Sequence, residues 1–224
     1  VGTKNALDYA VLCGAKRSVF LSSVEIYGEN RGDTDKFSED YLGYIDCNTL
    51  RAGYPEGKRA GEALCQAYIE KYGMDIVIPR ICRVYGPSML KTDSKALAQF
   101  IKKAAAYEDI VLKSEGTQLF SYCYAADVVF GLLLLLLKGE KGGSYNIADP
   151  RSDIRLKDLA AILAENAGKK VVFELPDEQE RKGYSKATKA LLDPSKINAL
   201  GFKARFSVAE GLERTLEILR EENR

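Results

Sequence analysis

The stretches RSVFLS (residues 17–22), YPEGKRAGEALCQAYIEKYG (residues 54–73) and IVIPRI (residues 76–81) predict a strand, a helix and a second strand. Both short runs are apolar enough for strands that are buried in a parallel sheet. Between them, apolar residues recur at helical spacing until Gly73, a residue type that commonly ends helices. A strand, a helix and a strand of these lengths form a right-handed βαβ unit in a sheet with helices on both faces. The first half of the chain is therefore predicted to be Rossmann-like.

The rest of the chain predicts one helix before the first strand and a mixture of short elements after Pro87. Further helices are expected at residues 3–11, 94–106, 128–137, 156–167 and 208–219, and further strands at residues 110–113, 144–148 and 171–175. The six leucines that begin at Leu132 are too few to span a bilayer, and we expect them in a buried helix. The predicted fold class is α/β, an incomplete Rossmann-like doubly wound parallel sheet plus a smaller α+β part.

The composition is that of an ordinary soluble globular protein. The 224 residues are 46% hydrophobic, and 33 basic residues are balanced by 32 acidic ones without a polybasic run. We therefore expect no nucleic-acid partner and no membrane partner. The five cysteines are widely spaced and form no CxxC pair, which is typical of reduced core residues in a cytoplasmic protein. No metal site is expected, and because the chain has no histidine, proton chemistry must use Tyr, Lys, Asp, Glu, Ser or Cys.

A tyrosine and a lysine in the predicted helix form the first chemical motif. Tyr54 and Lys58 are four residues apart and therefore share one helical face. A free tyrosine has a pKa of about 10, but a neighbouring ammonium favours the phenolate, which can act as a general base. A YxxxK pair alone is weak evidence in a chain with 13 tyrosines. Ser23 strengthens it, because it ends a predicted parallel strand, where open α/β sheets place their sites.

Three motifs, SSVEIYG (residues 22–28), YPEGK (residues 54–58) and RVYGP (residues 83–87), resemble a known family in their order and spacing. They are similar to the extended short-chain dehydrogenases, which include NAD-dependent nucleotide-sugar epimerases, dehydratases and decarboxylases. The resemblance runs the whole length of the chain. It implies NAD as the cofactor and a nucleotide-sugar as the substrate.

The resemblance also implies roles for individual residues. In the family, the tyrosine that matches Tyr54 takes the proton from a sugar hydroxyl while the carbon's hydride goes to NAD. The lysine that matches Lys58 also holds the nicotinamide ribose, and the serine that matches Ser23 bonds the same sugar oxygen. Ser22, Ser23, Tyr54, Lys58 and Cys82 are the implied cofactor-binding residues.

Glu25 distinguishes the subfamilies. Strand alternation predicts that it faces the same side as Ser23, near the reacting carbons of the sugar. Sugar 4,6-dehydratases carry STDEVYG with an adjacent Asp-Glu pair, and Val24 at the aspartate position disfavours dehydration. UDP-glucuronate decarboxylases carry STSEVYG, and residues 38–59 resemble them closely, so decarboxylation after C4 oxidation is favoured. A UDP-sugar 4-epimerase is the alternative, and a catalytically silent binding module of the same fold is the alternative of another class.

Three positions differ from the family or match it loosely. Arg83 replaces a substrate-contacting asparagine and is either a bidentate ligand for a diphosphate or sugar acid, or a surface arginine at a strand end. Phe120 replaces an arginine, and it can stack on a base but cannot bind phosphate. Arg181 matches an arginine that binds the nucleotide diphosphate or the substrate carboxylate, although a solvated arginine is an equal alternative. The implied substrate-binding residues are thus Glu25, Arg83 and Arg181.

The glycine-rich turn that grips the pyrophosphate in this family has no match in the chain. On the order of ninety residues would be needed ahead of Val1 to supply it. We therefore expect residues 1–82 to be the C-terminal half of an NAD-binding Rossmann domain. Residues 83–224 are expected to be mainly the substrate domain, with roughly 119–149 returning to the Rossmann part. Alone, the chain is expected to be inactive and to bind NAD weakly, and the family resemblance implies a homodimer.

Overall fold

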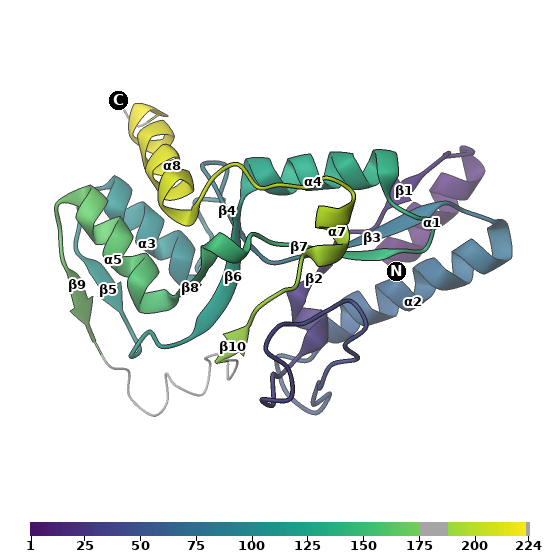
Figure 1. The fold of residues 1–224 in the computed structure, drawn as a ribbon, viewed down its shortest axis with the longest axis horizontal. Coiled ribbons are helices and arrows are strands. Elements are labelled where there is room, and N and C mark those ends of the chain that lie inside the picture. The colour runs from purple at the N-terminus through teal and green to yellow at the C-terminus, as the bar shows by residue number, and fades with distance from the viewer. Residues whose placement is uncertain (175–187, 223–224) are drawn as a thin grey trace. The chain divides into compact units, whose positions relative to one another are not determined.

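The structure is a computed structural model that describes residues 1–174 and 188–222 (Figure 1). The chain forms two compact units, each assembled from separate stretches of sequence. The first comprises Val1–Cys82, Val128–Ala148 and Leu192–Lys203, and the second comprises Arg83–Asp127, Asp149–Leu191 and Ala204–Arg224.

The first unit contains a parallel sheet. Its strands are β1 (Ser18–Val19), β2 (Ser22–Ser23), β3 (Ile76–Ile81) and β7 (Ser144–Ile147). β3 pairs in parallel with each of the other three, and among the described residues β1 and β2 pair with β3 alone. Ser18 pairs with Ile76 and Ser22 with Arg80, so β1 and β2 keep one register. The single strand predicted at residues 17–22 is therefore present, but it is interrupted in the middle.

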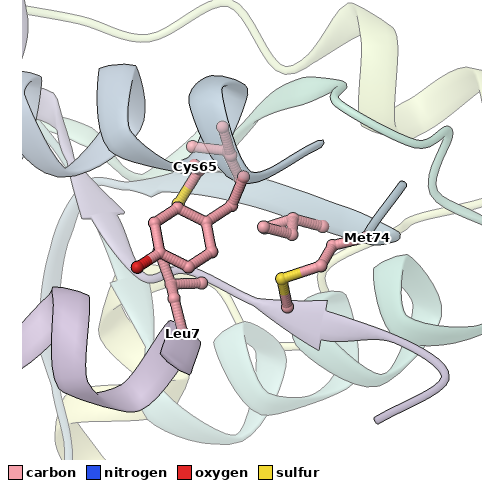
Figure 2. Close-up of a cluster of buried hydrophobic side chains, with 6 residues drawn as sticks. Leu7, Cys65 and Met74 are labelled. Carbon is pink, nitrogen blue, oxygen red and sulfur yellow. The ribbon is translucent and has the colours of Figure 1, made fainter. Parts of the chain in front are cut away.

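Two helices, α1 (Gly2–Leu12) and α2 (Gly53–Tyr72), pack together in this unit. α2 ends at Gly73, whose φ of 67° is the left-handed conformation expected of a helix stop. Buried side chains join both helices to β3 and its approach (Figure 2), namely Leu7, Cys65, Tyr68, Met74, Ile76 and Ile78. The helix–strand pair predicted around residues 54–81 is thus confirmed.

α4 (Ala125–Lys138) carries the leucine run and lies on the opposite side of β3 and β7 from α2 (Figure 1). Its inner side buries Leu135. On its outer side, Val129, Leu133 and Leu137 are 53%, 54% and 80% exposed. The prediction of a buried helix is wrong for this side, because α4 packs on the sheet with one face and no described residue covers the other. No helix among the described residues is long and apolar enough to cross a membrane.

The second unit combines helices with short strands, and three of its four described strand pairs are parallel. β6 (Leu119–Tyr124) pairs in parallel with β4 (Arg83–Tyr85) and with β10 (Lys189–Ala190). It pairs antiparallel with β8 (Asp153–Arg155). In a separate sheet, β5 (Ile110–Leu112) pairs in parallel with β9 (Val171–Phe173). Helices α3 (Ala96–Ala105), α5 (Leu156–Ala167) and α8 (Val208–Glu222) pack on one another.

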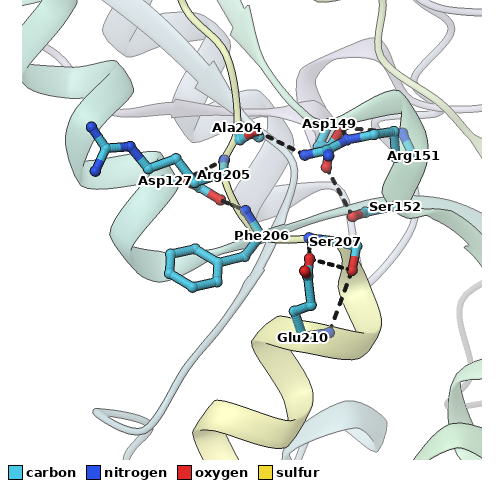
Figure 3. A network of polar contacts seen from close by, with 9 residues as sticks. All are labelled: Asp127, Asp149, Arg151, Ser152, Ala204, Arg205, Phe206, Ser207 and Glu210. Atoms are coloured by element: carbon cyan, nitrogen blue, oxygen red, sulfur yellow. Dashed lines mark hydrogen bonds and ion pairs between the residues drawn. The ribbon is translucent and has the colours of Figure 1, made fainter.

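A polar network fixes the segment that leads into α8 (Figure 3). The buried carboxylate of Asp127 accepts hydrogen bonds from the backbone N–H groups of Arg205 and Phe206, at 3.0 and 3.1 Å. Ser207 and Glu210 form a capping box at the start of the helix. The bonds that Ser207 donates from its hydroxyl and its backbone lower the pKa of Glu210.

Several short elements differ from the predictions. No strand was predicted at residues 83–85, where RVY forms β4 in the second unit. The sequence also gave no signal for β8 and β10, which have three and two residues and are too short to show a period. All five cysteines are free, as expected, but Cys13 and Cys47 are exposed and are not core residues.

Candidate active site

The predicted site residues Tyr54 and Lys58 lie on the first two turns of α2, which packs against β2 and the short 3-10 helix η1 (Val24–Tyr27). The helix approaches the interrupted strand closely at Gly61. A Cβ atom on Gly61 would lie 2.3 Å from the ring of Phe20, so only glycine fits without displacing that ring. This close approach places the Tyr54 and Lys58 side of the helix next to the strand end that carries Ser23.

Lys58 contacts both the helix and the strand. Its ammonium donates a hydrogen bond of 2.6 Å to the carbonyl oxygen of Leu21, in the interruption between β1 and β2. The same nitrogen lies 5.8 Å from the centroid of the Tyr54 ring and 5.5 Å from that of Phe20. The structure therefore places a cation beside the Tyr54 ring, and the Leu21 carbonyl between the two strands holds it there.

Tyr54 is the second residue of α2, and 57% of its surface is exposed. Its ring lies on the same side of the helix as the Lys58 ammonium, not among buried aliphatic side chains. An exposed phenol beside a cation is accessible to a substrate hydroxyl, which is a geometric requirement for a general base.

Ser23 is the buried N-cap of η1, where its Oγ accepts a 3.2 Å hydrogen bond from the backbone N–H of Glu25. Serine is a preferred N-cap residue, and Gly28 ends the turn with a φ of 64°. Glu25 therefore lies in a 3-10 turn and not in a strand. The strand alternation assumed for Glu25 is therefore wrong, because the cap ends the extended conformation at Ser23, and a position of Glu25 near the sugar stays a prediction.

Ser22 and Cys82, which were predicted to bind the cofactor, are both buried. The hydroxyl of Ser22 donates a 2.5 Å hydrogen bond to the carboxylate of Glu62 on α2. The backbone N–H of Cys82 donates to the carbonyl of Ile147 at 3.3 Å. The structure thus directs the Ser22 side chain toward the helix that carries Tyr54.

The remaining predicted residues belong to the second unit or lie outside the described residues. The guanidinium of Arg83 lies 3.5 Å from the centroid of the Phe120 ring. Phe120 is buried, so this arginine covers the ring that was expected to be able to stack on a base. Arg181 falls outside the described residues.

Sequence reasoning missed two charged residues next to the site. Glu62 and Arg80 form an ion pair with an N–O distance of 2.7 Å, and their side chains are only 13% and 12% exposed. Two signals were available. Glu62 continues the four-residue spacing of Tyr54 and Lys58 along α2, and Arg80 is a lone charge inside the apolar run IVIPRI.

A parallel sheet packed by a helix that carries a tyrosine and a lysine, with a serine at the end of the neighbouring strand, matches the class implied by the family resemblance. Residues 1–148 match the profile described as the NAD dependent epimerase/dehydratase family. The chain belongs to this family.

Curated and solved relatives agree with this assignment. The chain is 32% identical over 218 residues to UDP-glucuronic acid decarboxylase 6 of Arabidopsis thaliana, a match that covers 95% of this chain and 60% of that protein. UDP-glucose 4-epimerase of Thermotoga maritima, solved with UDP-glucose, gives a TM-score of 0.87 at 25% identity. The match covers 100% of this chain and 69% of the epimerase chain. A dTDP-glucose 4,6-dehydratase of Streptomyces venezuelae, solved with NAD, gives a TM-score of 0.82 at 26% identity. The match covers 99% of this chain and 65% of the dehydratase chain.

These comparisons confirm the predicted family and the α/β fold class. The chain spans about 60% of the length of the curated decarboxylase that it matches. The relatives include a decarboxylase, an epimerase and a dehydratase, so the family is established at the level of NAD-dependent, nucleotide-sugar-modifying enzymes.

Proposed function

We propose that this chain supplies the catalytic tyrosine, lysine and serine of an NAD-dependent enzyme that oxidises C4 of a nucleotide-sugar and then carries out a second step, for which we favour decarboxylation. The observation that carries the proposal is the position of the Lys58 ammonium, held by the Leu21 carbonyl beside the exposed ring of Tyr54.

In the proposed oxidation, Tyr54 as phenolate removes the proton of the C4 hydroxyl. The ammonium of Lys58 stabilises the phenolate, and the Ser23 hydroxyl bonds the same sugar oxygen. NAD, when bound, supplies the acceptor for the hydride that leaves C4. Lys58 fits a cofactor contact, because an ammonium has three donors and the bond to Leu21 uses one of them.

We propose a second step at the resulting 4-keto sugar, with Glu25 as the residue that acts there. A ketone next to a carbon that bears a carboxylate makes loss of carbon dioxide easier, because the ketone accepts the electron pair that the carboxylate leaves behind. Val24 beside Glu25 cannot transfer a proton, which weighs against elimination of water. Arg83 and Arg181 remain proposed substrate-binding residues, and Ser22 is proposed to anchor α2 instead of binding the cofactor.

Epimerisation at C4 is the second candidate, and the similarity to a solved UDP-glucose 4-epimerase favours it. A silent binding module of the same fold is less well supported, since the Lys58 ammonium lies 5.8 Å from the centroid of the Tyr54 ring. We also propose that the first unit belongs to the NAD-binding domain, that the second belongs mainly to the substrate domain, and that the protein is a homodimer. Light scattering of the purified protein tests its oligomeric state.

Mass spectrometry of products tests the proposed reaction. The protein, extended with a glycine-rich cofactor-binding segment from a relative if its gene supplies none ahead of Val1, is incubated with NAD and UDP-, dTDP-, CDP- or GDP-sugars. We expect a UDP-sugar acid to lose the mass of carbon dioxide. An unchanged mass with altered chromatographic mobility would show epimerisation, loss of the mass of water would show dehydration, and binding without any product would favour the silent module.

A further inference from the structure

The Glu62–Arg80 pair lies between the helix that carries Tyr54 and the strand that carries Ser23. Glu62 is two turns after Tyr54 on α2, and its Oε1 accepts hydrogen bonds from the Ser22 hydroxyl at 2.5 Å and from Arg80 Nε at 3.1 Å. Its Oε2 accepts a third from Arg80 Nη2 at 2.7 Å. The Glu62 carboxylate thus links α2 to Ser22, the residue before Ser23. Its two oxygens also bind Arg80 bidentately, which links α2 to β3.

The other branch of the Arg80 guanidinium extends the network to η1. Nη1 donates to the Tyr27 hydroxyl at 3.0 Å and to the carbonyl oxygen of Glu39 at 2.7 Å. Tyr27, the last residue of η1, is fully buried and donates in turn to the side-chain oxygen of Asn146 on β7 at 2.8 Å. The guanidinium therefore bonds both α2 and the turn that contains Glu25.

The Glu62–Arg80 pair differs from an ordinary surface ion pair in its burial and in the number of its hydrogen bonds. Both side chains are largely buried, and together they make five hydrogen bonds, so their orientation is fixed more strictly than that of an exposed pair. A buried ion pair contributes little net stability compared with an apolar replacement, but its directed bonds specify one arrangement of the segments that it joins.

We propose that Glu62 and Arg80 are positioning residues that hold Tyr54 and Lys58 on α2 in register with Ser23 on β2 and Glu25 on η1. This inference rests on the proposed function for its catalytic consequence. It also has a structural consequence that can be measured without catalysis. Loss of the Glu62 carboxylate would loosen α2 and η1 at their site-bearing ends while the rest of the unit keeps its fold.

The test variant is Glu62→Gln, which keeps the side-chain size but replaces one acceptor oxygen with an NH₂ group that cannot accept from Ser22 or Arg80. Asp75→Asn is the matched control. Asp75 forms an arginine–carboxylate ion pair of 2.7 Å with Arg17 in the same unit, and neither residue contacts Tyr54, Lys58, Ser23 or Glu25 in any described bond. Ser22→Ala is a milder variant that removes only the link from the carboxylate to the strand and leaves the ion pair intact.

Hydrogen–deuterium exchange on the 224-residue chain tests the structural consequence. We expect Glu62→Gln to speed amide exchange in residues 22–28 and 53–58 by about tenfold relative to Asp75→Asn, with Ser22→Ala between them. Equal exchange in Glu62→Gln and Asp75→Asn would overturn the inference. If Glu62→Gln does not fold, Ser22→Ala decides, and exchange equal to that of the wild type overturns the inference in the same way.

Kinetics on an active form of the protein test the catalytic consequence. Misplacement of a catalytic group by about 1 Å can cost on the order of 10²-fold, so we expect kcat of Glu62→Gln to fall about 10- to 100-fold with KM nearly unchanged. A kcat equal to that of Asp75→Asn would overturn the inference. If the wild-type protein turns over no nucleotide-sugar, the proposed function fails, whereas the exchange result still decides on positioning.

Discussion

At the scale of single residues, Tyr54 carries the proposed chemistry in one oxygen atom. Tyr54→Phe removes that oxygen and leaves a ring that is 57% exposed, so the fold should be unaffected. We expect kcat of the active protein to fall by about 10²- to 10⁴-fold, the usual contribution of a general base. Tyr9→Phe, on the exposed side of α1, is the control and should leave kcat unchanged. Steady-state rates measure both, and equal rates in the two variants would remove Tyr54 from the mechanism.

Tyr27 gives a pH-dependent prediction. Burial raises the pKa of Tyr27 to about 12, although the nearby Arg80 guanidinium lowers it. In the unfolded chain a tyrosine ionises near pH 10, so the unfolded state loses its proton first. Stability due to neutral Tyr27 is therefore complete below pH 10 and is lost between about pH 10 and 12.

The test compares the wild type with Tyr27→Phe. The variant lacks the hydroxyl bonds and should be less stable at pH 8, but its melting temperature should fall less steeply from pH 10 to 12. Circular dichroism at a series of pH values measures the two slopes. Parallel slopes would mean that Tyr27 ionises in the folded protein as easily as in the unfolded chain.

The sequence was sufficient to predict that Tyr54 and Lys58 share one side of a helix and that Ser23 ends a strand, and the structure packs α2 against that strand. It was not sufficient for Glu25. Alternation applies only while the chain stays extended, and the serine that was read as the strand end also caps a 3-10 turn. Arg80, and its partner Glu62 with it, was missed because a charge in an apolar run looks unfavourable until its partner is known.

At the scale of elements, the contact between α2 and the interrupted strand depends on a glycine. Gly61→Ala would place a Cβ 2.3 Å from the Phe20 ring, and we expect a cost of about 1–3 kcal/mol from overpacking. Gly57→Ala, one turn earlier on the same helix, meets no atom within 4 Å and should stabilise the helix by up to about 1 kcal/mol. Thermal unfolding distinguishes the two.

A second substitution checks the cause. Phe20→Leu removes the ring atoms that the new methyl group would meet, and it should recover part of the stability lost in Gly61→Ala. If Gly61→Ala alone is as stable as Gly57→Ala, α2 can move away from the strand without cost. The short distance would then not constrain the site.

Long elements were predictable from sequence and short ones were not. α2, β3 and α5 begin and end within one residue of their predicted positions, because their patterns extend over enough residues to show a period or end at a glycine. β4 and β8 have three residues each, and they are strands only because β6 lies beside them. β6 itself mixes serine and cysteine with tyrosines, so no alternation marked it.

At the scale of the whole molecule, the outer side of α4 presents an apolar surface that no described residue covers. Val129, Leu133 and Leu137 are its most exposed members. Contiguous apolar surface of this kind promotes association in water. The double variant Leu133→Glu/Leu137→Glu should stay soluble at higher concentration and bind less of the dye ANS, with an unchanged circular dichroism spectrum.

The control for that experiment is a double substitution on the other side of the same unit. Tyr9 and Leu12 of α1 are also exposed, at 68% and 85%, and Tyr9→Glu/Leu12→Glu adds the same charge elsewhere. If both double variants improve solubility equally, net charge is the cause and the α4 surface is not.

The interrupted strand has a practical consequence for anyone who purifies this chain. Among the described residues, β1 and β2 pair with β3 alone, so the second edge of the partly exposed β1 has no strand partner there. Such a strand edge can pair with an extended segment of a neighbouring molecule and start aggregation. Concentrated stocks are therefore expected to turn cloudy over time, and a proline introduced at Val19, or dilution, would be the first remedy to try.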